Sequence, residues 1–363
     1  MQFSIDGNKI EITNSYTYLG TQMTNTCSFA KATDIMYKKA LKALFSVYSS
    51  LDVRADLKNI PLFLKLFDSL VKPVLLYGSE VWGSAILSEN NPINKFTNKF
   101  YRTLLGVPRH TSNAGIHAEL GRFPIHVNIQ KAMIKYWFRL LTLPKDRLAS
   151  HCYWSLLDCK TTTDPWLNAI KKIITSTGQY FIWEGQKALA ASQKCVLRKH
   201  ESYVCQTLQD VSFQTLGDNI SQQTKLTLFR NSKPLNKPAK YLNLLSCRKN
   251  RTMLSKFRLG TLDLEIEKGR RHNIPREARV CKLCSSGSVE DEIHFILNCP
   301  KLDNTRISSL TTLSANSNRF PKLTPEEKIK YLFFNENISA IDLEISSSLL
   351  CDLQETKVHI LSE

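Results

Sequence analysis

Alternating apolar and polar residues predict β-structure at the start of the chain. The stretches Phe3–Ile5 and Ile10–Ile12 alternate on either side of Asp6–Lys9, where glycine and asparagine tolerate the positive φ of a tight turn. Aromatic and β-branched residues then predict a further strand over Tyr16–Met23. The chain is therefore expected to open with a β-hairpin followed by a third strand.

Beyond these strands, apolar residues recur at helical spacing. They do so from Ile35 to Tyr48 and, behind the helix-starting Pro61, from Phe63 to Val71. The same spacing, with Gly- and Pro-containing breaks, predicts further helices over residues 93–105, 126–141, 166–175, 192–208, 241–257 and 325–334. The fold is therefore expected to be mainly α with a small N-terminal β element.

Polar residues interrupt this apolar pattern in two places. Between residues 208 and 239, Ser, Gln, Asn, Thr and Pro accumulate, which indicates a linker. After Arg306 the chain is rich in Ser, Thr and Asn. These changes predict a first region over 1–148, a helical connector and linker over 149–240, a basic and cysteine-rich region over 241–306, and a poorly defined C-terminal tail over 307–363.

Composition adds a strong positive charge to this picture. The 363 residues include 49 Lys and Arg against 32 Asp and Glu, which leaves a formal charge of +17. Such a surplus favours a polyanionic partner, RNA or DNA, over a solvated surface without a partner. The first residues do not resemble a secretory signal, and no apolar stretch approaches the roughly 20 residues that span a bilayer. We therefore expect no membrane association and an intracellular location, in the nucleus or the cytoplasm.

Four residues near the C-terminus have the spacing of a zinc site. Cys281, Cys284, His294 and Cys299 form the pattern C-x2-C-x9-H-x4-C. Tetrahedral Zn²⁺ needs four such ligands, and a two-residue spacer lets both thiolates of the first pair face one ion. A short helix over Glu290–Leu297 would carry the histidine. The sequence thus predicts one structural Zn²⁺ in a small module resembling a zinc knuckle, whose core would be too small without the metal.

Other interpretations of these residues are weaker. The same four groups could be buried free thiols and a core histidine, although four ligand types at this spacing argue against that. A catalytic zinc normally keeps an open position, whereas this set fills all four. The acidic run Glu290–Glu292 is better explained as a charged helix start, with one carboxylate accepting from the imidazole, than as a general base. The remaining cysteines form no second ligand set along the sequence.

Positive charge is concentrated directly before this module. Such clusters bind phosphates through charge and counterion release, and arginine adds bidentate geometry. An ordinary solvated helix face is the alternative. The candidate nucleic-acid contacts are Arg248, Lys249, Arg251, Lys256, Arg258, Lys268, Arg270, Arg271, Arg276 and Arg279. A second, weaker basic set consists of Arg102, Arg109 and His110.

Several segments resemble LINE-type (non-LTR) retrotransposon reverse transcriptases. Those similar to the zinc region of that family are residues 256–260 (KFRLG), 264–271 (LEIEKGRR), 274–277 (IPRE) and 281–300, with the run EDEIHFILNCP. Those similar to its post-palm and thumb-side region are residues 16–20 (YTYLG), 73–83 (PVLLYGSEVWG), 105–109 (LGVPR) and 119–124 (ELGRFP). The resemblance covers about residues 1–148 and 241–306 and implies binding of template, element RNA or target DNA.

The sequence also departs from this family. Its members polymerise DNA with two metal ions held by adjacent aspartates of a palm motif. This sequence contains no Asp-Asp dipeptide and begins where the family would have just left the palm. No catalytic residue is predicted, and no polymerase activity is expected from this chain alone. The upstream polymerase portion of the same element is a possible partner.

The sequence therefore favours a nucleic-acid-binding and zinc-binding C-terminal part of an RNA-directed DNA polymerase that lacks the catalytic palm. A zinc-scaffolded protein-interaction module is the alternative if acidic residues neutralise the basic surface in space. A part of an active reverse transcriptase whose catalytic half lies elsewhere is a further alternative. So is a decaying reading frame without a selected role.

Overall fold

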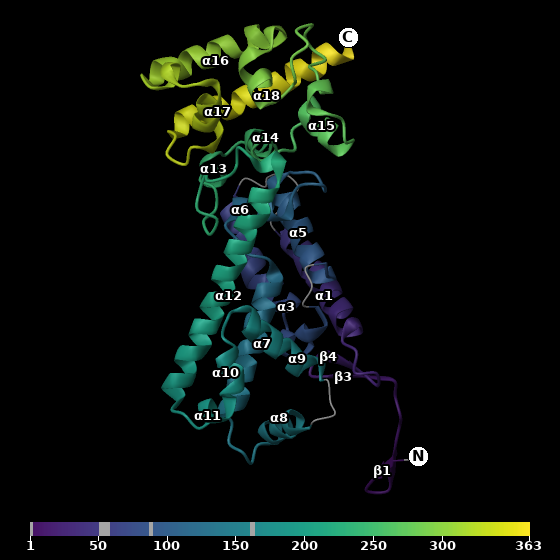
Figure 1. Cartoon of the computed structure of the whole chain (residues 1–363). Helices are drawn as coiled ribbons and strands as arrows, with labels where there is room; N and C mark the ends of the chain where they lie inside the picture. Colours follow the sequence, from purple (N-terminus) through teal and green to yellow (C-terminus); the bar gives the residue numbers. More distant parts are fainter. Residues whose placement is uncertain (1–2, 51–58, 87–89, 160–163) are drawn as a thin grey trace. The chain divides into compact units, whose positions relative to one another are not determined.

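The computed structural model describes residues 3–50, 59–86, 90–159 and 164–363 (Figure 1). It is mainly helical with small antiparallel β elements, which confirms the predicted fold class. The described residues belong to two compact units. The first lies within Met1–Leu51, Leu66–Thr97 and Pro124–Ser212, and the second within Asp52–Lys65, Asn98–Phe123 and Phe213–Glu363. The sequence-based boundaries after residues 148 and 240 therefore fall inside these units.

Two hairpins form the β-structure of the described residues. Strand β1 (Phe3–Ile5) pairs with β2 (Asn8–Ile10), and β3 (Ser15–Tyr18) pairs with β4 (Thr21–Thr24). The first hairpin was predicted. The single strand predicted over Tyr16–Met23 is wrong, because the chain turns back within it. Leu19 and Gly20 adopt φ values of 45° and 81°, a left-handed turn that places the two halves side by side.

The first unit consists of helices whose core includes two buried tryptophans. Trp82 and Trp137 are both 0% exposed. A Cβ on Gly83, the residue after α4, would meet Ile129 Cγ2 at 2.5 Å and Met133 Sδ at 2.8 Å. The end of α4 and helix α7 therefore lie too close together there for a larger residue. Its helices are α1 (Ala30–Ser50), α3 (Lys72–Leu75), α4 (Ser79–Trp82), α7 (Ile125–Thr142), α8 (Leu148–Asp158), α9 (Pro165–Ser176), α10 (Tyr180–Glu184) and α11 (Gln186–Ala190).

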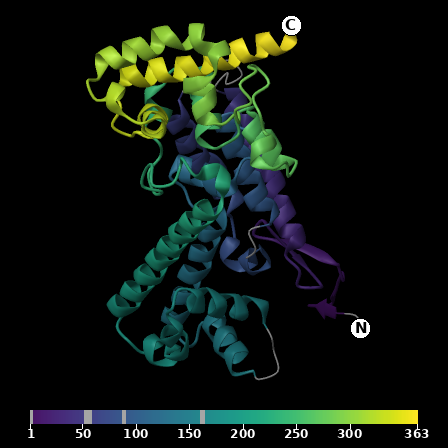
Figure 2. The same ribbon diagram turned by 45° about the horizontal axis from the view of Figure 1, so that its top comes forward.

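The second unit contains the cysteine-rich region and the C-terminal helices. Its helices are α6 (Asn113–Leu120), α13 (Tyr241–Leu244), α14 (Arg248–Arg258), α15 (Glu265–Arg271), α16 (Asp303–Asn316), α17 (Pro325–Phe334) and α18 (Ala340–Ser362). Helices α16 and α18 lie side by side, and α14 packs against α18 (Figures 1 and 2). Three helices contain residues of both units: α2 (Ile60–Leu66), α5 (Pro92–Leu105) and α12 (Lys194–Gln222).

The linker predicted over residues 208–239 is wrong in its first half. Helix α12 continues to Gln222, because Leu216 and Ile220 extend its buried stripe at a spacing of four residues. Beyond the helix, Phe229 and Ala239 are buried as well, at 2% and 0% exposure. These buried apolar side chains anchor the polar segment within the second unit, so the segment is part of the folded structure.

The C-terminal tail, which the sequence left poorly defined apart from a helix over 325–334, is mostly helical. Helix α18 buries Ser346 and Ser347, both 0% exposed, beside the fully buried Leu349 and Leu350. The serine hydroxyls donate to carbonyls one turn earlier, Ser346 Oγ to Asp342 O at 2.6 Å and Ser347 Oγ to Glu344 O at 3.0 Å. The buried face of α18 therefore contains small polar residues whose hydroxyls form hydrogen bonds within the helix. Because these buried positions are polar, the apolar spacing typical of a helix is weak in this part of the sequence.

The helix predicted over residues 241–257 is broken into two. Helix α13 ends at Leu244 and α14 begins at Arg248. Arg251 Nη1 donates a 2.9 Å hydrogen bond to the carbonyl of Leu245, which lies in the break. The guanidinium thus satisfies a carbonyl that the interruption leaves without a helical partner.

Candidate metal centre and basic surface

The four predicted ligands come together in the second unit. One ligand atom from each of Cys281, Cys284, His294 and Cys299 lies within 4.8 Å of the others. The Sγ atoms of Cys281 and Cys299 are 3.9 Å apart, and Cys284 Sγ is 3.4 Å from His294 Nε2. Thiolates about 2.3 Å and an imidazole about 2.0 Å from a tetrahedral ion would be about 3.5–3.8 Å apart. These four groups can therefore hold one metal ion.

Local structure places the first pair of ligands on a hairpin. Val280 and Val289 form an antiparallel bridge, and Cys281 N donates to Ser288 O at 2.9 Å. The turn contains Gly287 with a φ of 68°, a conformation that favours glycine. The tight hairpin directs Cys281 and Cys284 toward the same point.

The second pair of ligands flanks one irregular helical turn. His294 starts a π-helical turn, His294–Asn298, and its backbone N–H donates to Asp291 Oδ1 at 3.0 Å. Cys299 N donates to His294 O at 2.7 Å at the end of this turn. A wider turn brings residues five apart onto one face, which suits the four-residue spacer between the two ligands. The short helix expected over Glu290–Leu297 is present over residues 292–298, with its last turn wider than in an α-helix.

Arg306 donates hydrogen bonds to backbone carbonyls of this turn, a role that the sequence did not indicate. The side chain is 3% exposed and donates to Ile296 O at 3.2 Å and, through Nη2, to Cys299 O. It also forms a 3.2 Å ion pair with Asp303. Because buried carbonyls at a helix end need donors, Arg306 stabilises the backbone that carries Cys299.

Burial changes the acidity of the ligand groups. Burial raises the pKa of the Cys281 thiol and raises that of Cys299 to about 12. Burial opposes ionisation of Cys284 too, but hydrogen bonds with Ser286 outweigh it and lower the pKa of this thiol. Burial lowers the pKa of His294 and so favours the neutral imidazole that binds metals. A cation among the sulfur atoms would supply the charge that two buried thiolates need.

The acidic run beside the ligands pairs with basic side chains. Glu290, 1% exposed, forms a 2.6 Å ion pair with the buried Lys357 of α18 and accepts from the backbone N–H of Glu265 at 2.8 Å. Asp291 pairs with Arg276 at 2.8 Å and accepts from the backbone of His294. Asp291 thus accepts from the backbone N–H of His294, whereas the sequence predicted an acceptor for its imidazole N–H. Lys357 was missed because it lies 67 positions away in the sequence.

Two of the ten candidate nucleic-acid contacts are buried, which corrects their predicted role. Arg258 is 3% exposed and Arg251 is 2% exposed. Arg258 forms a bidentate pair with the fully buried Glu119, with Nε–Oε1 at 2.7 Å and Nη2–Oε2 at 3.2 Å, and donates to Phe333 O at 2.7 Å. A guanidinium enclosed in this way cannot reach a phosphate. Both arginines are structural.

Most of the other candidates contact acidic groups or carbonyls. Arg279 donates to Ile274 O at 2.9 Å and to Ile266 O at 3.2 Å. Ion pairs link Lys249 to Glu355, Lys268 to Asp263 and Glu265, Arg270 to Glu267, and Arg276 to Asp291. Within the described part of the chain, Arg248, Lys256 and Arg271 have no such carboxylate partner. The predicted basic surface is thus partly neutralised.

Burial also perturbs one of these carboxyl groups. Burial raises the pKa of Glu267 to about 7, although Arg270 beside it acts in the opposite direction. This side chain is 7% exposed. Its charge, and therefore the neutralisation of Arg270, should change near neutral pH.

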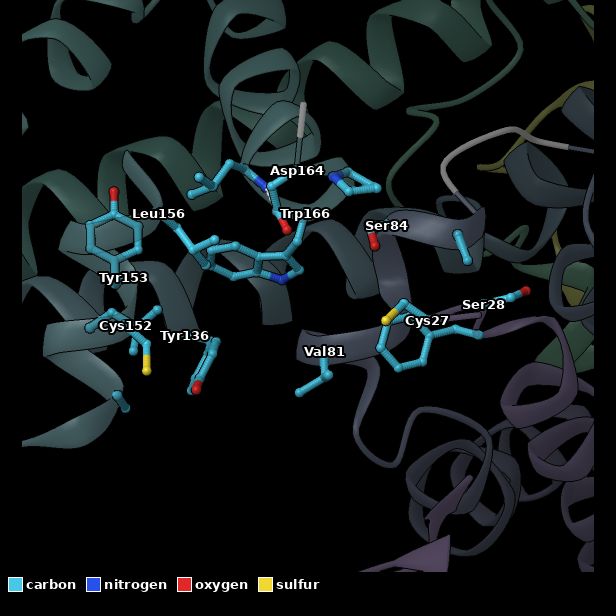
Figure 3. A pocket seen from close by; sticks show the side chains of 16 residues that line it. Cys27, Ser28, Val81, Ser84, Tyr136, Cys152, Tyr153, Leu156, Asp164 and Trp166 are labelled. Carbon is cyan, nitrogen blue, oxygen red and sulfur yellow. Dashed lines mark hydrogen bonds between the residues drawn. The ribbon is translucent and has the colours of Figure 1, made fainter. Parts of the chain in front are cut away.

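A mostly apolar cavity of about 530 Å³ lies in the first unit (Figure 3). Tyr136 and Trp166 line it with their rings 5.9 Å apart and nearly perpendicular, and Asp164 at its edge caps α9 by accepting from Leu167 N at 2.8 Å. Cys27 and Cys152 also line it and are free thiols. Among the described residues, the side chains that line it include no Lys, Arg or His.

The chain matches none of the protein-family models, curated proteins or solved structures with which it was compared. Among the described residues, no helix combines the length and the apolar character needed to cross a bilayer. The same residues contain no second group of His, Cys, Asp and Glu arranged to hold a metal.

Proposed function

We propose that the second unit is a zinc-stabilised, nucleic-acid-binding region of a LINE-type reverse transcriptase, without polymerase activity of its own. The observation that carries this proposal is the convergence of Cys281, Cys284, His294 and Cys299 within 4.8 Å. Three thiolates and one imidazole are ligands typical of structural zinc, and all four tetrahedral positions are filled by the protein. Zinc would therefore hold the module together and leave its surface to bind a partner.

Two further observations support nucleic acid as that partner. The formal charge of +17 favours a polyanion. Segments that resemble the zinc region of LINE-type reverse transcriptases, residues 256–260, 264–271, 274–277 and 281–300, all belong to the second unit. Phosphate contacts supply most of the affinity in such complexes, because bound counterions are released.

Salt-dependent binding tests the proposal. The zinc-loaded full chain should bind fluorescent single-stranded RNA and duplex DNA, measured by fluorescence anisotropy at several KCl concentrations. Each neutralised phosphate contributes about 0.9 to the log–log salt slope on duplex DNA and about 0.7 on single strands. A slope of several units is expected. If neither nucleic acid bound at low ionic strength, the proposal would be wrong.

Primer extension tests the second half of the proposal. Two-metal phosphoryl transfer needs clustered carboxylates, and the sequence has no Asp-Asp dipeptide. We expect no incorporation with Mg²⁺ or Mn²⁺ above a heat-inactivated control. Incorporation would favour the interpretation that the chain is part of an active polymerase.

A protein-interaction module is the second candidate, and two observations favour it. Ion pairs neutralise Lys249, Lys268, Arg270 and Arg276 of the basic segment. In addition, large apolar side chains of α16 and α18 are exposed, among them Ile307 at 58%, Ile341 at 70% and Val358 at 58%. Failure of both nucleic acids to bind, with zinc still present, would favour this candidate.

A further inference from the structure

Cations from three separate parts of the chain gather elsewhere in the second unit, outside the metal centre. We call them the loop cluster. Its members are Arg102 of α5, Arg109 and His110 of the loop that follows, Lys225, and Arg271 at the end of α15. The sequence divided these residues between a weak basic set and the main basic segment, and it did not indicate Lys225.

Hydrogen bonds and close packing hold the cluster in place. Arg102 Nη2 donates to Thr111 O at 3.1 Å and also contacts the Asn113 side chain. Lys225 Nζ donates to His110 O at 3.4 Å. The carbonyl of Lys225 lies so close to Gly260, with a φ of 59°, that a Cβ there would be 2.6 Å from it. The side chains of Arg102 and Lys225 are therefore oriented before any ligand arrives, which lowers the entropic cost of binding.

Few acidic side chains of the described residues lie near the loop cluster. Among the residues that the structure describes, no carboxylate forms an ion pair with its five members. Arg102 Nε is buried without a hydrogen-bond partner. Glu267 acts against the burial that lowers the pKa of Lys225, but this carboxylate pairs with Arg270. Like charges held together in this way carry a free-energy cost that a bound anion would remove.

The acidities agree with this geometry. Burial, then Arg271 and Lys225, lower the pKa of His110. Burial, then Arg109, lower the pKa of Arg102. Burial also lowers the pKa of Lys225, with Arg270 and Arg102 acting in the same direction. The charged groups of the three segments thus interact electrostatically.

We propose that the loop cluster binds phosphate groups in the backbone of the nucleic acid. Arginine forks match the geometry of a phosphate, a lysine supplies a point charge, and the exposed Arg109, His110 and Arg271 face solvent, where an extended chain can reach them. Such contacts position a strand without reading its bases. This inference rests on the proposed function and names the residues that would perform it.

The test compares two triple variants of the zinc-loaded full chain. Arg109→Ala, Lys225→Ala and Arg271→Ala together remove three charges from the cluster. The matched control, Lys301→Ala, Arg319→Ala and Lys322→Ala, removes three exposed charges of the same unit that lie outside it. Binding of single-stranded RNA and duplex DNA is measured over a range of KCl concentrations. The cluster variant should lose on the order of 10- to 100-fold in affinity, and its slope should flatten by about two to three units on duplex DNA.

The outcomes separate the two proposals. No binding by the parent chain would overturn both. Binding by the parent that the cluster variant retains, with the same slope as the control, would overturn only the loop cluster. A double variant, Arg109→Ala with Arg271→Ala, keeps Lys225 and its hydrogen bond, so it answers the same question if the triple variant folds poorly. Equal competition by poly-glutamate would show a general anion surface and would also overturn the inference.

A second readout reports on His110 itself. A phosphate beside the imidazole should raise its pKa, because an opposite charge favours the protonated ring. Histidine NMR signals followed against pH, with and without the RNA, should show an upward shift for one resonance, which His110→Gln would remove. An unchanged titration curve for that resonance in the saturated complex would contradict phosphate binding at this cluster.

Discussion

Two buried polar clusters in the second unit differ in what they need to be stable. Around Arg258, the carboxylates of Glu119 and Glu336, the carbonyl of Phe333 and the ring of Tyr241 at 5.3 Å surround the guanidinium. Donors and acceptors match there, so the cluster is complete. At the metal centre, Cys281, Cys284, His294 and Cys299 instead face one another.

This difference in internal pairing indicates which of the two buried clusters needs a ligand to be stable. Buried charges persist when they are paired and hydrogen-bonded, as Arg258 and Glu119 are. The three sulfur atoms and the imidazole nitrogen face one another without an ion pair of this kind, and a cation would complete them. The loop cluster is a third case, because no carboxylate of the described residues forms an ion pair with it and three of its five members are exposed. Burial and internal pairing thus separate structural polar groups from binding groups in this unit.

Removal of the metal should give the largest effect. We expect one Zn²⁺ per chain by elemental analysis, and Cys284→Ser should lose it. Structural zinc in small modules contributes roughly 10–16 kcal/mol of apparent binding free energy, which is also folding free energy. Hydrogen exchange should therefore show residues 279–306 unprotected, while α7 and α9 of the first unit stay protected.

The matched control for this variant is Cys247→Ser, since Cys247 is an exposed thiol outside the ligand set. It should leave zinc content unchanged. Full zinc occupancy in Cys284→Ser would contradict the assignment of the ligands.

Breaking the complete cluster should be the next largest effect. Arg258→Met leaves Glu119 buried without its partner and should lower the free energy of unfolding by about 3–5 kcal/mol. Urea denaturation of the zinc-loaded chain measures this loss. Adding Glu119→Gln to Arg258→Met should recover part of it, because the unpaired charge is then removed. Lys249→Met, at an exposed pair with Glu355, is the control and should change stability little. A similar effect of both single variants would refute the structural role of Arg258.

The buried pair between Lys357 and Glu290 should have an intermediate effect. It joins α18 to the metal module, with Lys357 Nζ also donating to Asp263 O at 2.7 Å. Lys357→Met should cost about 3 kcal/mol, because Glu290 and the carbonyl lose their donor. We expect faster hydrogen exchange in α18 and no loss of zinc. Loss of zinc in this variant would mean that the metal centre depends on the C-terminal helix.

Glu267 should produce the smallest effect, as a dependence of stability on pH. Its folded pKa, raised by burial to about 7, lies above the unfolded value of 4.5. Between these values the folded state binds more protons, so stability should fall as pH rises through this window. We expect a loss of no more than about 3 kcal/mol, since a pKa difference of one corresponds to about 1.4 kcal/mol and the two values differ by about 2.5. Urea denaturation across the window should show this slope for the parent and a flatter one for Glu267→Gln. Identical slopes would exclude Glu267 as its source.

The group of four residues that could hold a metal, and several of the helices, could be predicted from the sequence because their causes are local. Cys281 to Cys299 form one hairpin and one helical turn, so residue type and spacing determine which groups can meet. Helices α1, α7 and α17 show regular apolar spacing, and α17 matches its predicted range over Pro325–Phe334. In these elements, the residues that interact lie within about 20 positions of one another in the sequence.

Tertiary structure alone decided which charged residues are structural and which are free to bind. Arg258 pairs with Glu119, which lies 139 positions away, and Lys357 pairs with Glu290, 67 positions away. Lys225 reaches His110 across 115 positions. Burial and ion pairing depend on neighbours that only folding brings together, and a local charge pattern looks the same whether or not they are present. The sequence therefore determined the chemistry of the metal site, whereas the folded chain determined where its positive charge remains available.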